Sequence, residues 1–205
     1  MEVGATSEPA GRRVRADAQK NRQRLLEVAV RALSEQGADV APATIAKLAG
    51  VGVGTLYRHF PTREALIEAA YRSDLTRLCD TVPELLAEHT AAQALRIWMG
   101  HCVDHAMTKH GMADALRIVV ASGVNLYAES RSLLTDAIAA LLQAGAADGT
   151  LRADLDPFDV LIMLSGIPLA VGEWGTSQQI SRLLDLLMDG LTKGVSAAPQ
   201  GQHPR

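Results

Sequence analysis

The chain has 205 residues, of which 48% are hydrophobic but only 3% aromatic, and its formal net charge is -3. This length suits one sizeable core or two small domains, and long stretches rich in Ala and Leu predict an all-α protein. No apolar run is as long as a membrane-spanning helix, and the first residues lack the pattern of a secretory signal, so we expect a cytoplasmic protein without a membrane partner. The two cysteines, Cys79 and Cys102, lie in helical patterns without metal-site spacing and are expected to be buried free thiols.

The net charge conceals an uneven distribution along the chain. Between Gly11 and Arg63 there are ten Lys and Arg residues against four acidic ones, whereas from Glu64 onward there are ten against seventeen. A basic first part on an acidic body suits a protein that binds a polyanion at one end.

The chain begins with a predicted arm and a first helix. Residues 1–16 are polar, contain Gly and Pro and show no periodicity, which predicts a disordered basic arm. Its arginines either contact the phosphates of a polyanion or form a solvated tail: Arg12, Arg13 and Arg15. A helix is predicted from about Asp17 to Gln36, and Gly37 ends it. Its apolar stripe consists of Leu25, Leu26, Ala29, Val30 and Leu33.

Two short helices with a glycine turn between them come next. Ile45, Ala46 and Ala49 recur at helical spacing in the first, and Gly50 is placed to end it. The second is about two turns long, with two apolar residues facing inward and a hydroxyl, a phenol, a guanidinium and an imidazole left largely exposed. The two inward residues are Leu56 and Phe60, and the four largely exposed ones are Thr55, Tyr57, Arg58 and His59. Such a helix suits the major groove of DNA, where the second helix of a helix-turn-helix unit binds.

The stretch from Ile45 to Leu66 resembles the N-terminal signature of the tetracycline-repressor-like (TetR) regulators. The matching motifs, in the family's order and spacing, are Gly50-Val51, Thr55-Leu56-Tyr57, His59-Phe60 and the Arg63-Glu64-x-Leu66 start of the next helix. The chain departs from the family pattern at Gly52 and at Ala41-Pro42-Ala43-Thr44, where capping residues are common. The resemblance implies a helix-turn-helix module over 17–63, joined by a fourth helix to a helical ligand-binding and dimerisation domain over 64–194. With a disordered tail over 195–205, this makes about nine helices.

The resemblance and the exposed positions beside it predict a set of DNA-binding residues: Thr44, Lys47, Val53, Gly54, Thr55, Tyr57, Arg58, His59 and Arg63. The family positions that meet the DNA backbone or bases are matched by Thr55, Tyr57 and His59, and Arg63 matches one that contacts a phosphate. Val53 and Gly54 match positions that face bases in some members, and here they offer only apolar contact or close backbone approach. Arg58 contacts either a guanine or a phosphate. The alternative roles are packing for Tyr57 and capping of local carbonyls for His59.

Helix four is predicted to run from residue 64 towards Leu86 and to connect the two modules. The pattern stays helical beyond it and ends with two helices, from Asp156-Pro157 to about Val171 and from 180 to 191. Both have wide apolar faces. The resemblance implies that they pair with their two-fold mates in a four-helix bundle, and that the homodimer presents two recognition helices to a palindromic operator in double-stranded DNA. Alternatively, these helices only close the monomer core.

A ligand-gated regulator also needs a cavity for a small-molecule effector. The candidate lining residues mix aromatic, sulfur-containing and polar groups: Trp98, His101, Cys102, His105, Met112, Asn125, Tyr127, Met163 and Trp174. Several of them are equally compatible with ordinary core packing. His101 and His105 are four residues apart on one helical face, a spacing that fits a metal site, a polar pocket wall or plain surface, and no metal or cofactor is predicted.

Catalytic motifs are missing from the sequence, including GxSxG, a Walker loop, a dinucleotide fingerprint and a metalloprotease pair, so no enzymatic activity is predicted. We predict a sequence-specific transcriptional regulator, namely a repressor that a small-molecule effector releases from its operator. Two alternatives stay open: a DNA-binding dimer without an effector, and an activator.

Overall fold

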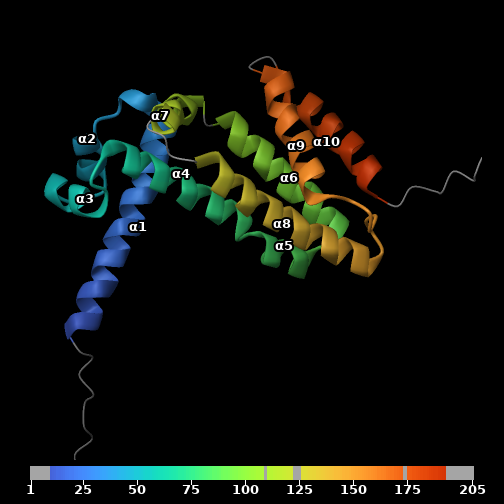
Figure 1. The fold of residues 1–205 in the computed structure, drawn as a ribbon, viewed down its shortest axis with the longest axis horizontal. Coiled ribbons are helices and arrows are strands. Elements are labelled where there is room, and N and C mark those ends of the chain that lie inside the picture. The colour runs from blue at the N-terminus through green and yellow to red at the C-terminus, as the bar shows by residue number, and fades with distance from the viewer. Residues whose placement is uncertain (1–9, 109, 122–125, 173–174, 193–205) are drawn as a thin grey trace, which may run out of the picture. The chain divides into compact units, whose positions relative to one another are not determined.

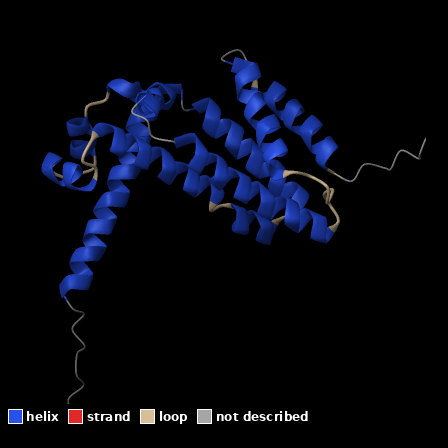
Figure 2. Cartoon of the chain, viewed as in Figure 1, coloured by secondary structure: helices blue, strands red, loops and turns tan. Residues whose placement is uncertain are grey.

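The computed structural model describes residues 10–108, 110–121, 126–172 and 175–192. Their regular structure is helical, apart from one isolated β-bridge between Leu151 and Thr192 (Figure 2). The elements, labelled in Figure 1, are α1 (Ala10–Gln36), the 3-10 helix η1 (Gly37–Asp39), α2 (Pro42–Leu48), α3 (Val53–His59), α4 (Arg63–Cys79), α5 (Val82–Glu88), α6 (Ala91–Thr108), α7 (His110–Ala121), α8 (Leu126–Asp148), α9 (Pro157–Val171) and α10 (Ser177–Leu191). The all-α prediction is confirmed for these residues. None of these helices combines the length and the apolar content needed to cross a membrane.

Two helix boundaries differ from the prediction. α1 begins at Ala10, seven residues before the predicted start at Asp17. The predicted fourth helix stops at Cys79, and a separate helix, α5, begins at Val82. Pro83 accounts for this break, because a proline ring clashes with the carbonyl four residues earlier, here that of Cys79, and has no N–H to donate to it. Residues 1–9 of the predicted arm and the predicted tail over 195–205 lie outside the described residues.

The two last helices have side-chain caps at their starts. The carboxylate of Asp156 accepts a hydrogen bond of 2.7 Å from the N–H of Phe158, and Pro157 occupies the first turn of α9. The predicted start of this helix is confirmed. The hydroxyl of Thr176 accepts from the N–H of Gln179 in the same way at the start of α10.

The chain divides into two compact units, which are described separately. The first comprises residues up to Asp74 together with 109–126, and the second comprises Leu75–Thr108 and the chain from Tyr127 onward. The predicted boundary between the two main domains was instead a single one, between residues 63 and 64. The sequence-distant helix α7 joins the first unit, because its apolar stripe packs into the core formed by the helix-turn-helix: Met112, Ala115 and Val119.

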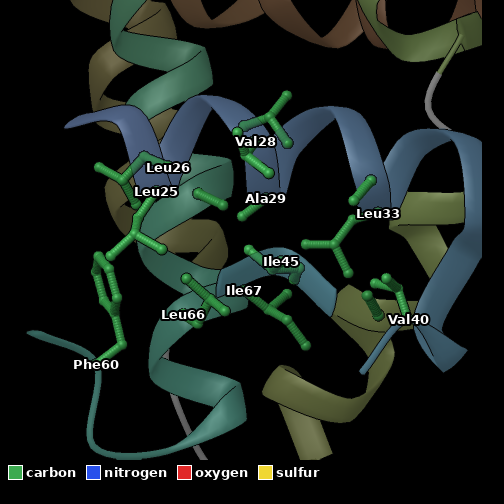
Figure 3. Packing of buried hydrophobic residues seen from close by; sticks show 14 of the residues in the cluster. Leu25, Leu26, Val28, Ala29, Leu33, Val40, Ile45, Phe60, Leu66 and Ile67 are labelled. Carbon is green, nitrogen blue, oxygen red and sulfur yellow. The ribbon is translucent and has the colours of Figure 1, made fainter. Parts of the chain in front are cut away.

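The core of the first unit is aliphatic and draws on α1, α2, α3, α4 and α7. Figure 3 shows side chains from α1, α2 and α4 pointing toward one another, with the ring of Phe60 at one edge. Members of this core that are almost completely buried include Leu25, Leu33, Ile45, Leu56, Leu66 and Ile67. This core fixes how α2 and α3 are held on α1, and therefore which face of α3 is left for a partner.

The core of the second unit is built around Trp98 of α6. This residue is fully buried, and its indole N–H donates a 3.1 Å hydrogen bond to the carbonyl of Leu78, in the last turn of α4. The apolar residues around it come from α6, α8, α9 and α10, among them Leu95, Met99, Ile138, Leu141, Leu164 and Leu187. The hydrogen bond and the shared core hold α6 against the end of α4 within this unit.

Candidate nucleic-acid interface

A glycine turn joins α2 to α3. Gly50 has φ +69°, the left-handed conformation that favours glycine. Its N–H donates to the carbonyl of Lys47 at 3.1 Å, and the N–H of Val51 donates to that of Ala46 at 3.0 Å. This pair of bonds is the Schellman motif, which closes a helix C-terminus and turns the chain. The predicted helix-turn-helix junction is therefore present at the predicted residue.

The short helix α3 presents three different faces. Leu56 and the following Phe60 point into the core of the first unit and are at most 2% exposed. Outside the core, Val53 is 41% exposed and Tyr57 44% exposed. Gly54 and Arg58 are exposed beside them, whereas Thr55 and His59 are half-buried on the flanks. The outward face of α3 therefore consists of Val53, Gly54, Tyr57 and Arg58, and we call these four residues the α3 face.

The remaining predicted DNA contacts divide into two groups. Thr44 and Lys47 are exposed on α2 and are free of the core. Arg63, at the start of α4, is instead half-buried, and its Nη2 donates a 3.2 Å hydrogen bond to the carbonyl of Val40, just before α2. Arg63 therefore ties α4 to the start of α2 inside the unit, a structural role that sequence reasoning missed.

Two arginines of α1 lie beside the helix-turn-helix and were not among the predicted site residues. The guanidinium carbon of Arg22 lies 5.3 Å from the centre of the Phe60 ring, at the end of α3. Nη2 of Arg24 lies 3.8 Å from the position that a Cβ on Gly50 would take. Both contacts join residues more than twenty positions apart in the chain. The only sequence signal for them was the excess of basic residues before the first core residue of α1.

The described candidates for the effector site belong to both units. In the second unit, Trp98, Cys102 and His105 follow one another along α6 at spacings of four and three residues, so they share a face of this helix. Trp98 is buried, Cys102 and His105 are half-buried, and His101 is exposed.

The remaining effector candidates lie on other helices or outside the described residues. Met112 is 1% exposed in the core of the first unit, and Met163 of α9 is 58% exposed. Asn125 and Trp174 lie outside the described residues, as does the side chain of Tyr127. Within residues 10–108, 110–121, 126–172 and 175–192, no three His, Cys, Asp or Glu side chains are grouped so that they could hold a metal ion.

Burial affects the titration of the polar groups on the shared face of α6. It lowers the pKa of His105 below its ordinary value, and the nearby Arg77 guanidinium lowers it further. It raises the pKa of the Cys102 thiol strongly, with a smaller contribution from Cys79. Both shifts favour the neutral form of the group, so the imidazole of His105 and the thiol of Cys102 are uncharged near neutral pH.

Two family models match the chain. Residues 25–70 match the bacterial regulatory proteins of the tetR family, and residues 90–193 match the C-terminal domain of SbtR-like transcriptional regulators. The first match covers most of the helix-turn-helix and the second covers half of the chain. Among curated proteins, an HTH-type transcriptional regulator of Staphylococcus aureus (strain MRSA252) is 39% identical over 82 residues, which are 38% of this chain. That match spans 42% of the relative's own length.

Solved structures match over most of the chain. The TetR transcriptional regulator SCO0520 from Streptomyces coelicolor is 53% identical, with a TM-score of 0.73, and the match covers 83% of this chain and 98% of that one. The TetR transcription regulatory protein from Mycobacterium vanbaalenii is 33% identical, with a TM-score of 0.68, covering 87% and 99% of the two chains. With a helix-turn-helix whose second helix has an exposed polar face, these matches show that the chain belongs to the TetR family of DNA-binding transcriptional regulators, which are not enzymes.

Proposed function

We propose that this regulator is a homodimeric repressor, which binds a palindromic operator through the α3 face and is released by a small-molecule effector. The exposed α3 face is the observation that carries the proposal. Leu56 and Phe60 anchor α3 from behind, so Tyr57 and Arg58 are held outward on a short, fixed helix. A phenol and a guanidinium at adjacent exposed positions offer hydrogen bonds to phosphates and to the edges of bases.

The surface of the last two helices supports self-association. Over its fifteen residues, α9 contains a single charged side chain, Asp159. Large apolar side chains point outward from it, and Leu169 is 84% exposed. On α10, Leu186 is also exposed. Several exposed large apolar side chains on neighbouring helices are typical of an interaction site, and a second copy of the same face would cover them symmetrically.

The shared face of α6 supports an effector site in the second unit. An uncharged imidazole and a thiol, both half-buried, follow a buried indole along one helix: His105, Cys102 and Trp98. A few polar groups in apolar surroundings are typical of sites for small, largely apolar molecules. Trp98 is hydrogen-bonded to the end of α4, so a ligand on this face would act directly on the last turn of that helix.

The proposal is tested by selecting bound duplexes from a random DNA pool, first with the protein alone and then with a mixture of metabolites present. The expected result is a palindromic sequence that mobility-shift assays show to be bound by the dimer and released by some fraction of the mixture. Recovery of a single, non-repeated half-site would contradict the dimeric arrangement. Binding that no metabolite changes would favour a regulator without an effector.

Tyr57 is the cleanest residue with which to test the role of the α3 face. Tyr57→Ala removes an exposed side chain and should weaken binding to the selected operator by about 1 to 3 kcal/mol while thermal unfolding stays unchanged. Tyr57→Phe separates the contribution of the hydroxyl from that of the ring. Arg63→Ala is unsuitable for this purpose, because it also removes the hydrogen bond to Val40. Equal affinity of Tyr57→Ala and the unaltered protein would exclude the α3 face as the DNA contact.

The dimer surface is tested by placing a charge on it. Leu169→Glu should shift sedimentation velocity from dimer to monomer, since a buried carboxylate in an apolar interface is strongly unfavourable. Gln143→Glu adds the same charge at an exposed position of α8 and serves as the control. A Leu169→Glu protein that remains dimeric would show that α9 is not at the interface.

A further inference from the structure

The first part of α1 extends well beyond the core that the helix serves. From residue 17 onward, where the side chains of α1 are described, Leu25 is the first one in the core of the first unit, and every residue from Asp17 to Arg24 is exposed. The helix begins at Ala10, so fifteen residues precede Leu25. At 1.5 Å per residue they span about 22 Å. We call residues 10–24 the α1 extension, and Figure 1 shows it reaching past α2 and α3.

The α1 extension is strongly basic. It contains six Lys and Arg residues and one acidic residue, Asp17. Lys20 and Arg24 are four residues apart, so their charges face each other along the helix and destabilise it slightly. A helical segment that is exposed over residues 17–24 and contains a repulsive pair is stabilised when a polyanion neutralises its charges.

The chemistry of the α1 extension excludes a membrane surface as its target. A helix that lies on a lipid surface needs an apolar face to bury among the acyl chains. From residue 17 to residue 24 the sequence is Asp-Ala-Gln-Lys-Asn-Arg-Gln-Arg, which has no large apolar side chain. These residues offer positive charge and hydrogen-bond donors around the helix, which suits phosphates approached from the side.

The base of the α1 extension lies beside the helix-turn-helix. Arg22 stacks on Phe60, at the end of α3, and Arg24 lies next to Gly50, in the turn before α3. Both ends of the recognition helix are therefore bordered by guanidinium groups from α1. A duplex held on the α3 face would meet the base of the extension first, and the remaining residues reach outward from that point.

We propose that the α1 extension binds phosphates of the duplex that flanks the segment read by α3, without reading its sequence. The proposal depends on DNA binding through the α3 face. A helix of about 22 Å runs alongside about six base pairs at 3.4 Å each, so the flanking contact is long enough to affect affinity. Lys20 and Arg24 are the described donors of this contact, whereas Arg22 also stabilises the end of α3.

The test measures affinity on two duplexes by fluorescence anisotropy over a range of salt concentrations. One duplex contains only the selected operator, and the other has about eight further base pairs of arbitrary sequence on each side. The unaltered protein should bind the longer duplex more tightly and with a steeper dependence on salt. The variant Lys20→Gln with Arg24→Gln should lose this advantage, and its salt slope on the longer duplex should fall by up to about 2 per subunit.

The control variant removes the same number of charges elsewhere. Arg31→Gln with Arg117→Gln neutralises two exposed arginines, one in the second half of α1 and one on α7, and should keep the length dependence. Glutamine has a helix propensity similar to that of Lys and Arg, so circular dichroism should be unchanged in both variants.

Three results would overturn the inference. The unaltered protein could bind the two duplexes equally, the variant could retain the length dependence, or the variant could lose the same affinity on both duplexes. The last result would place Lys20 and Arg24 within the operator itself. Failure of the unaltered protein to bind either duplex would instead count against DNA binding through the α3 face, so the two failures are distinguishable.

Discussion

Gly54→Ala should strengthen the fold and weaken DNA binding at the same time. Gly54 lies in the first turn of α3 and is exposed. Apart from its chain neighbours and the backbone of its own helix, no atom lies within 4 Å of the place where a Cβ would stand. Its φ is outside the left-handed region, so alanine fits the backbone without strain. Glycine within a helix costs about 0.5 to 1 kcal/mol relative to alanine, and the substitution should raise the free energy of unfolding by that amount.

The opposite effect on binding follows from the place of Gly54 in the α3 face. A methyl group there projects from the same surface as Tyr57 and Arg58 and keeps the backbone of α3 away from the duplex. We expect a loss of about 1 to 3 kcal/mol, the range of a lost base contact, or about 5- to 150-fold in affinity. Only close approach of this backbone to DNA produces stabilisation and lost affinity together.

The assay pairs thermal unfolding with anisotropy on the selected operator. Gly100→Ala is the matched control, since Gly100 lies within α6 and its nearest neighbour is Nη1 of Arg96 at an ordinary 3.8 Å. Both variants should raise Tm by about 1 to 4 °C, but only Gly54→Ala should bind more weakly. Unchanged affinity of Gly54→Ala would refute close approach of α3, and a lowered Tm would refute the local helix geometry.

Three further outcomes are expected. Gly50→Ala should lower the free energy of unfolding in urea by about 1 to 2 kcal/mol, because alanine must adopt φ +69° there although a Cβ has room. The His105 pKa is lower in the folded than in the unfolded chain, so the unfolded chain takes up the proton first, and stability should fall as the pH drops below about 6.5. His105→Asn should reduce that slope of the urea midpoint, and an identical slope would contradict the burial of the imidazole. Burial raises the pKa of Cys79 from 9.0 to about 11, and Asp80 and Asp136 add to this. Its thiol should therefore react with a disulfide reagent at pH 8 about a hundredfold more slowly in the folded than in the urea-unfolded chain, and equal rates would contradict this environment.

Local patterns accounted for the part of the protein that binds DNA. The spacing of Leu56 and Phe60 determined which side of α3 faces inward, and so which side carries Tyr57 and Arg58. Gly50 ends α2 because glycine tolerates a positive φ, a property of this one residue that needs no distant partner. Asp156 and Pro157 identified the start of α9 for similarly local reasons. The break after Cys79 was also readable, since Pro83 stands four residues later, but the continuing apolar pattern concealed it.

Tertiary packing decided what these patterns leave open. The stripe of α7 that includes Met112 fits a ligand pocket as well as a core, and only its contact with α1 and η1 places it beneath the helix-turn-helix. The hydrogen bond of Arg63 to Val40 joins residues far apart in the chain, and the position of Arg22 depends on a ring that also lies far along it. Periodicity shows which side of a helix is apolar but not which partner covers it, because that depends on how distant segments pack together.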